Sequence, residues 1–273
     1  MPNPQCVPGA DGTVVSRRGL LAIAGSAGLT AVVAGCSVGS DSAAVATAIP
    51  RDTATPPAPT AGTVPASPLT AVESPSAAPS GVMLCRAAWG ARPALPGGRP
   101  QTITRMTLHH SAVALPDNSQ VVARLQQHQR YHQVDKGWVD IAYHAAVDRE
   151  GNIFQLRDTG IAGDTATDYD TTGHFLVLAE GNFDEESVSE AQLRGTALVF
   201  AWAVRRFGIG VDTLTGHRDV ASGTSCPGQN LEAHVTSGDL KARIADLLVT
   251  GFVLQPLCGL EADERVAAIR AGR

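Results

Sequence analysis

Hydrophobic positions along the chain repeat with two periods, one typical of strands and one of helices. Ile103, Met106 and Leu108 alternate imperfectly with polar residues before a histidine pair, which predicts a core strand within 101–113. Strands and helices partly alternate, so we expect an α/β fold: a single domain with a central mixed β-sheet flanked by helices. The other predicted elements are two strands around a turn at 150–152, a strand in 173–183, and helices over 117–133, 187–208, about 237–249 and about 261–271.

Residues 187–208 form the clearest predicted helix. Ser187 and Glu190 have the spacing of a capping box, and Gly208 is a residue that ends helices. The segment TGHRDVASGTSCPG, residues 215–228, follows directly and is too rich in Gly, Ser and Pro to be a helix. The predicted buried stripe of the helix consists of Leu193, Ala197, Ala201 and Val204.

The first 80 residues lack the pattern of a folded core. Arg17 and Arg18 precede a weakly apolar run, 20–34, which is too short to span a bilayer and is followed by Gly35 and Cys36. A twin arginine followed by this ending resembles the signal peptide of a bacterial lipoprotein, whose cysteine is lipidated; a plain signal peptide with an incidental cysteine is the alternative. We expect residues 1–36 to be the signal peptide, with Cys36 lipidated, residues 37–80 to be a disordered Ala/Thr/Pro/Ser linker, and residues 81–273 to form the domain.

Three of the five cysteines fall inside the predicted domain: Cys85, Cys226 and Cys258. In an oxidising compartment an odd number leaves one thiol over. Because Cys85 and Cys258 bracket the domain, a disulfide between them would close a long loop and stabilise the fold by about 5 kcal/mol. Cys226 then remains unpaired, as an inert thiol, a nucleophile or a thiolate that binds a metal.

His217 and Cys226 lie nine positions apart and supply two candidate metal ligands. A tetrahedral catalytic zinc takes three protein ligands and leaves one position open. The third ligand has to come from a separate element that ends at the same sheet edge, and the strand-end pair His109–His110 is the natural source. Since adjacent residues on a strand point to opposite faces, only one of these two histidines reaches the metal.

These motifs resemble, in sequence and in order, the zinc-dependent N-acetylmuramoyl-L-alanine amidases, which share their fold with the peptidoglycan recognition proteins. The resemblance implies that His109, His217 and Cys226 bind Zn²⁺. It also implies that Tyr143 is a catalytic tyrosine, while Thr224 stands where members of the family have Lys or Thr. The segments that carry it are RAAWGARP, TLHHSA, HQRYHQVDKGWVDIAYHAAVDREGNIFQLRD, VLAEGNF and GHRDVASGTSCPG.

The function implied is hydrolysis of the amide bond between N-acetylmuramic acid and L-alanine in peptidoglycan. Two neutral imidazoles and one thiolate leave a Zn²⁺ site with net charge +1, which lowers the pKa of a bound water toward ~7. Tyr143, with Thr224 as a lesser donor, would stabilise the developing oxyanion. We expect an exported monomer whose partners are peptidoglycan and, through the lipid anchor, the outer face of the cytoplasmic membrane. The net charge of −5 argues against nucleic acid.

The chain departs from the family pattern in three places. The interval from His217 to Cys226 is nine where eight is more frequent, with Gly223 as the candidate extra residue. An Asp- and Thr-rich stretch, 160–175, replaces the family's Gly-x-His-Ala and Asn in a peptide-contacting loop, which questions stem-peptide recognition. Neither lysine of the chain lies near the cysteine motif, which excludes the Lys form of oxyanion stabilisation.

Two other functions are open alternatives. A peptidoglycan-binding receptor without appreciable catalysis would use the same fold, although such relatives commonly lose the cysteine that this chain keeps. A cysteine peptidase built on Cys226 is less favoured, because the thiol precedes Pro227 in a turn with no helix N-terminus behind it.

Several polar residues near these motifs are expected to be structural. His128 and His132 stand four apart, but the segment lacks the glutamate of the helical metalloprotease motif. Arg218 and Asp219 are expected to brace the loop through a salt bridge, with orientation of a metal-bound imidazole by Asp219 as the alternative. His110 and His144 are expected to face away from the site as packing or orienting groups.

Overall fold

The computed structural model describes residues 78–273. The expected signal peptide, the lipidated Cys36 and all but the last three residues of the expected linker lie outside this range. Within it, no helix combines the length and the apolar character needed to span a membrane.

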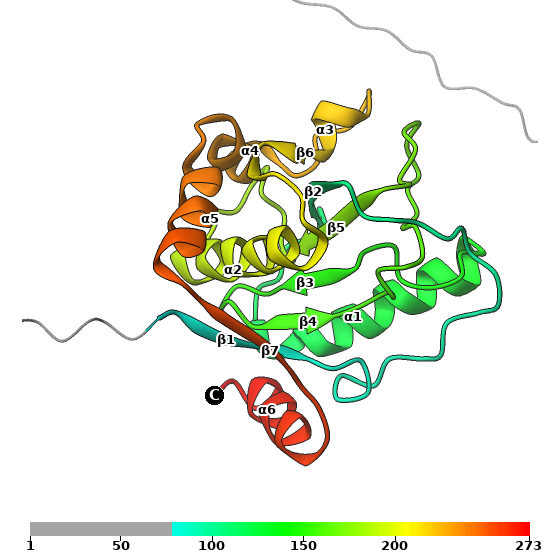
Figure 1. Cartoon of the computed structure of the whole chain (residues 1–273). Helices are drawn as coiled ribbons and strands as arrows, with labels where there is room; N and C mark the ends of the chain where they lie inside the picture. The colour runs from blue at the N-terminus through cyan, green and yellow to red at the C-terminus, as the bar shows by residue number, and fades with distance from the viewer. Residues whose placement is uncertain (1–77) are drawn as a thin grey trace, which may run out of the picture. The chain divides into compact units, whose positions relative to one another are not determined.

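A seven-stranded sheet in the order β6-β2-β5-β3-β4-β1-β7 forms the centre of the domain (Figure 1). All neighbouring strands are parallel except β3 and β4, which pair in antiparallel fashion around the predicted turn. The expected mixed sheet is therefore confirmed. The strands are β1 (Ser80–Leu84), β2 (Arg105–His110), β3 (Ala145–Val147), β4 (Ile153–Gln155), β5 (His174–Ala179), β6 (Leu214–Gly216) and β7 (Val253–Leu257).

Helices cover both faces of the sheet, as an α/β domain requires (Figure 1). On one face α2 (Glu190–Phe207), α4 (Gln229–Thr236) and α5 (Asp239–Thr250) bury their apolar residues against the strands. On the other face α1 (Val121–Arg130) and α6 (Leu260–Arg270) do the same. A 3-10 turn, Asn118–Gln120, precedes α1, and a π-helical turn, Tyr131–Asp135, extends it; a second 3-10 turn, Val211–Thr213, precedes β6.

The start of α2 corrects one detail of the sequence analysis. The N-cap is Ser189, whose Oγ accepts a hydrogen bond from the Gln192 backbone N–H at 3.0 Å, and not Ser187. With this start, Val188 and Leu193 flank the cap and both pack into the core, an arrangement that fixes the entry of the chain into the helix. The predicted end is right, since Gly208 adopts a left-handed conformation with φ +67° and donates to Val204 O at 2.9 Å.

The register between β2 and β6 determines where the chemistry-bearing residues lie. Leu108 of β2 is opposite Gly216 of β6, and the two strands are parallel. His109 and His217 each follow one of these paired residues, so both lie at the carboxyl end of this strand pair. In Figure 1 this end is at the top, where β6 and the single-turn helix α3 (His217–Val220) are labelled.

The opposite edge of the sheet holds the disulfide. Cys85 directly follows β1 and Cys258 directly follows β7, and the structure joins the two with their Cα atoms 5.1 Å apart. Cys226 is the free cysteine of the described residues and is buried.

Candidate metal centre

Three donor side chains from distant parts of the sequence meet at the carboxyl end of β2 and β6. A nitrogen of His109, a nitrogen of His217 and the sulfur of Cys226 all lie within 4.8 Å of one another. His109 comes from the end of β2, His217 begins α3, and Cys226 lies in the loop before α4. All three residues are buried, with exposed fractions of 2%, 7% and 8%. Within residues 78–273 no other group of His, Cys, Asp and Glu forms such a cluster.

The separation between Cys226 and His109 matches the size of a zinc ion. Zn–S and Zn–N bonds of about 2.3 and 2.1 Å at a tetrahedral angle place the sulfur and a ring nitrogen about 3.6 Å apart. The Cys226 Sγ and His109 Nδ1 atoms are 3.6 Å apart. The longer interval between His217 and Cys226 therefore does not keep the thiol from the histidines. Two nitrogens and one sulfur are a donor set that zinc prefers.

Burial determines the protonation of these groups. It lowers the pKa of His109 well below its usual value, aided by the neighbouring His217, and lowers that of His217 to about 4. Both imidazoles are therefore neutral near pH 7, which is the form that binds metals. Burial raises the pKa of the Cys226 thiol to about 12. A thiol with this pKa supplies almost no thiolate near neutral pH unless a cation is bound, which weighs against a cysteine nucleophile.

Glycines let the backbone approach closely around the ligand loop. A Cβ at Gly216 would overlap the Glu232 carboxylate and lie 3.0 Å from Pro227 Cδ. Gly228 has φ +89°, and a Cβ there would lie 2.6 Å from the Phe183 carbonyl carbon and 2.8 Å from His110 Nδ1. These two positions tie the cysteine loop to β6 and to the end of β2.

The loop is held by hydrogen bonds to its backbone groups and not by the expected Arg218–Asp219 salt bridge. The Arg218 backbone N–H donates to Cys226 O at 2.8 Å, and its guanidinium donates to Ser225 O. Asp219 Oδ2 accepts from the Gly216 N–H at 2.8 Å, which is the cap of the α3 turn. The expectation that residues 215–228 contain no helix is wrong for His217–Val220, which form the single turn α3. This turn is stabilised because the Asp219 carboxylate accepts from the free N–H at its start.

The histidines next to site residues point elsewhere. His110 Nδ1 accepts from the Phe183 N–H at 3.3 Å. His144 Nδ1 accepts from the Leu176 N–H at 2.9 Å, and its Nε2 lies 3.0 Å from Ile161 O. Both imidazoles connect strands to loops behind the site.

The histidine pair on α1 does not chelate a metal with the cluster. His132 Nδ1 accepts from the Ala142 N–H at 3.1 Å, which holds the segment that leads to Tyr143. His128 Nε2 lies 3.1 Å from the buried carboxylate of Glu180, without hydrogen-bond geometry. Glu180 follows β5 directly, so this pair joins α1 to the sheet.

Tyr143 and Thr224 lie beside the cluster, next to different ligands. The Tyr143 and His109 rings are 5.2 Å apart, and desolvation, with Cys226 as the next cause, raises the pKa of the Tyr143 phenol above its usual value. Thr224 Oγ1 accepts from the Cys226 N–H at 3.1 Å and keeps its own O–H available to donate. Both hydroxyl groups are thus protonated and able to donate near neutral pH.

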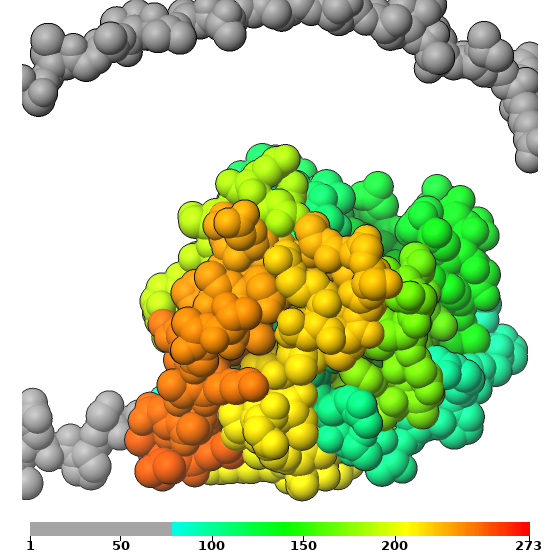
Figure 2. All heavy atoms as spheres, turned by 90° about the horizontal axis from the view of Figure 1, so that it is seen from above, coloured from blue at the N-terminus to red at the C-terminus, as the bar shows by residue number. Residues whose placement is uncertain are grey.

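An open cavity of about 320 Å³ contains the cluster together with Tyr143 and Thr224. It adjoins a second cavity, of about 470 Å³, along α1; Tyr131, His132 and Tyr143 line both. Figure 2 looks onto this end of the domain, where the gold segment that carries His217 and Cys226 lies beside green segments from the middle of the chain. The site therefore has open space beyond the cavity that contains the cluster.

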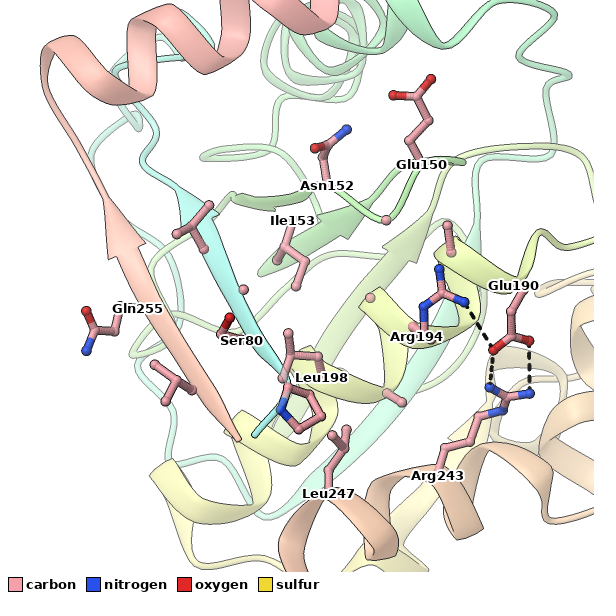
Figure 3. Close-up of a pocket in the computed structure, with 18 of the residues that line it drawn as sticks. Ser80, Glu150, Asn152, Ile153, Glu190, Arg194, Leu198, Arg243, Leu247 and Gln255 are labelled. Carbon is pink, nitrogen blue, oxygen red and sulfur yellow. Dashed lines mark hydrogen bonds and ion pairs between the residues drawn. The ribbon is translucent and has the colours of Figure 1, made fainter. Parts of the chain in front are cut away.

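Another cavity, about 890 Å³, lies between β1, β7 and the helices α2 and α5 (Figure 3). It contains none of the cluster residues. Glu190 accepts from Arg243 at 2.7 and 3.1 Å and lies 3.5 Å from Arg194, so its carboxylate is paired with two arginines of the cavity wall (Figure 3).

Sequence reasoning missed three residues at the site. Lys136 lines the cavity with the cluster although it is far from the cysteine motif in sequence. Thr167 and Tyr169 contact the two histidines of the cluster, and both come from the stretch that departs from the family pattern. No periodicity or motif marks them, because their positions depend on how a long loop folds back over the sheet.

A mixed α/β domain with a buried His–His–Cys cluster at the carboxyl end of its strands defines a class of candidate metal-dependent proteins. Comparison with known sequences is consistent with this class. The sequence profile of the family described as N-acetylmuramoyl-L-alanine amidase matches residues 99–229. Peptidoglycan-recognition protein LB of Drosophila melanogaster is 30% identical over 168 residues, which cover 57% of this chain and 68% of that protein.

Two further relatives extend the comparison. The human N-acetylmuramoyl-L-alanine amidase is 32% identical over 155 residues, which cover 54% of this chain and 26% of that protein. The structure of the peptidoglycan recognition proteins LCa and LCx with bound tracheal cytotoxin is similar with a TM-score of 0.52 and 28% identity, over 57% of this chain and 95% of that one. The chain belongs to the N-acetylmuramoyl-L-alanine amidase family, which includes peptidoglycan recognition proteins.

Proposed function

We propose that the protein is a zinc-dependent hydrolase of the amide bond between N-acetylmuramic acid and L-alanine in peptidoglycan. The observation that carries this proposal is the buried two-nitrogen, one-sulfur cluster on the wall of an open cavity, beside the Tyr143 hydroxyl. The substrate class comes from the family: relatives are named as amidases of this bond and as peptidoglycan recognition proteins. The two cavities that share Tyr143 in their walls leave room for a sugar and a peptide portion.

Zinc held by His109, His217 and Cys226 would supply Lewis acidity toward the amide carbonyl and toward a hydrolytic water. The protein's own donors act on the charge that develops on the carbonyl oxygen. Tyr143 is protonated at neutral pH, and burial raises the pKa of its phenol further, so its hydroxyl donates a hydrogen bond. Thr224 is a second donor, with its oxygen fixed by the Cys226 N–H.

Product analysis tests this proposal. The purified protein is incubated with disaccharide peptides from peptidoglycan, and the products are separated and weighed by mass spectrometry. We expect free peptides with an L-alanine amino terminus, about one zinc per chain by metal analysis, and loss of both in His109→Ala and Cys226→Ala. His234→Ala is the matched control, because His234 of α4 pairs with Asp239 of α5 at 2.8 Å and lies outside the cavity.

The second candidate function is a receptor on the same fold. It is favoured by relatives that are named for peptidoglycan recognition. A protein that binds zinc and these disaccharide peptides but releases no peptide would overturn the hydrolase proposal in favour of the receptor. A protein that binds no zinc would overturn both the cofactor and the mechanism.

We further propose that the protein is exported and anchored by lipid at Cys36, as the twin arginine and the Val-Ala-Gly-Cys ending indicate. In cells, the anchored protein should partition into detergent and carry labelled fatty acid. Cys36→Ser should move it to the aqueous phase. Equal partitioning of the parent and the variant would refute the anchor.

A further inference from the structure

The segment 163–172, between β4 and β5, packs against the metal cluster and lines part of the same cavity. In sequence it is the Asp- and Thr-rich stretch that replaces the family's peptide-contacting loop. In the structure two of its hydroxyl groups are hydrogen-bonded to the two histidines of the cluster. Each of these bonds uses the Nε2 atom of the imidazole.

Thr167 engages His217. Its Oγ1 lies 2.8 Å from His217 Nε2. The same hydroxyl lies 2.7 Å from Thr165 Oγ1, which in turn accepts from the Thr167 N–H at 3.1 Å. The position of the Thr167 oxygen is therefore fixed by its own segment as well as by the imidazole.

Tyr169 engages His109. Its hydroxyl lies 3.3 Å from His109 Nε2. The Tyr169 ring also packs against His217, with centroids 5.1 Å apart, and edge-on against His174 at 5.3 Å. One side chain thus contacts both histidines of the cluster.

Two arginines and a neighbouring loop hold the segment in place. At one end Arg157 pairs with Asp164 at 2.6 Å. At the other end Arg99 donates to Asp170, Thr171 and Thr172, each at 2.8 Å. In between, Ser222 of the ligand loop donates to Asp168 at 3.1 Å.

An imidazole that binds a metal through one nitrogen carries its proton on the other, and a fixed acceptor for that proton sets both the tautomer and the ring orientation. Because Nε2 of each histidine is taken by a hydroxyl, Nδ1 is the atom left for a metal. The contact between Cys226 Sγ and His109, at 3.6 Å, uses Nδ1. We propose that Thr167 and Tyr169 are positioning residues that hold His217 and His109 in the orientation required for metal binding. This inference rests on the metal site of the proposed function but not on its catalytic activity.

The experiment measures zinc affinity directly. The metal-free protein is titrated with zinc against a chromophoric chelator of known affinity, and the cobalt-loaded protein is examined by visible absorption. We expect Thr167→Val and Tyr169→Phe each to weaken zinc binding about 10- to 100-fold and to change the cobalt spectrum. Thr167→Ser, which keeps the hydroxyl, should retain the parental affinity.

Matched controls separate positioning from general damage. Thr250→Val removes a hydroxyl that bonds Asp246 O at 2.8 Å at the end of α5, and should leave the zinc affinity unchanged. Tyr143→Phe removes a hydroxyl beside the cluster that makes no hydrogen bond to either histidine, and should also bind zinc normally. Urea unfolding of each metal-free variant reports its fold separately from its metal affinity.

The outcomes distinguish this inference from the proposed function. Zinc affinities within twofold of the parent in both Thr167→Val and Tyr169→Phe, with unchanged cobalt spectra, would overturn the positioning role even if the protein cleaves peptidoglycan. An affinity loss in these variants and its restoration in Thr167→Ser would support the role even if no peptide is released. A Thr167→Ser protein as weak as Thr167→Val would also contradict it.

Discussion

Removing the disulfide between Cys85 and Cys258 should strongly destabilise the domain without affecting the metal site. The two cysteines extend β1 and β7 at one edge of the sheet, while the cluster lies at the ends of β2 and β6 at the other edge. The perturbation is the double substitution Cys85→Ser and Cys258→Ser, which leaves no unpaired partner at this edge.

The magnitude follows from the length of the loop that the disulfide closes. The two cysteines are 173 positions apart. The chain-entropy relation for a loop of this length gives a stabilisation of about 5 kcal/mol at 25 °C, because the cross-link restricts the unfolded chain. For a domain of this size, the loss corresponds to a fall in melting temperature of roughly 10–20 °C.

Urea unfolding followed by circular dichroism measures the loss in the free energy of unfolding, and the zinc titration described above measures the site. We expect the zinc affinity of the folded double variant to equal that of the parent. Treating the parent with a phosphine reductant should reproduce the same destabilisation. A variant that unfolds within about 1 kcal/mol of the parent would show that the unfolded chain is already restricted, and would refute the estimate.

Three other predictions concern the site and its support. Tyr143→Phe should lower kcat about 10²- to 10³-fold with unchanged zinc content, since it removes one donor to the oxyanion; an unaltered kcat would exclude that role. Burial raises the pKa of Glu232 to about 7, so the folded domain binds this proton more tightly than the unfolded chain, and the contribution of Glu232 to stability falls as pH rises from about 4.5 to 7. The free energy of unfolding of Glu232→Gln, relative to that of the parent, should therefore rise by on the order of 1–2 kcal/mol from pH 5 to pH 8 in urea unfolding. A difference that stays constant across that range would contradict the assignment. Gly216→Ala should weaken zinc binding, because its Cβ would displace the Glu232 carboxylate or the Pro227 ring behind the ligand loop; a parental zinc affinity would show that the loop relaxes without moving the ligands.

The elements with strong hydrophobic patterns and the candidate metal ligands at the strand ends could be predicted from the sequence. The β2 strand, the β3–β4 hairpin and the helix α2 have strong local patterns, and they occur where those patterns predict. The short strands β1, β6 and β7 and the helix α4 were missed. β6 has only three residues, too few to show a period, and it exists because β2 offers it hydrogen bonds.

Local sequence therefore determined the fold class and the residue types for metal chemistry, because hydrophobic periodicity and a His and Cys pair in a Gly-rich loop are visible along the chain. The tertiary structure decided which atoms meet. The parallel register of β2 and β6 places His109 beside His217, and a loop without any sequence signal supplies Thr167 and Tyr169 as their hydrogen-bond partners. Such contacts depend on how distant segments pack on the sheet, so local sequence patterns do not predict them.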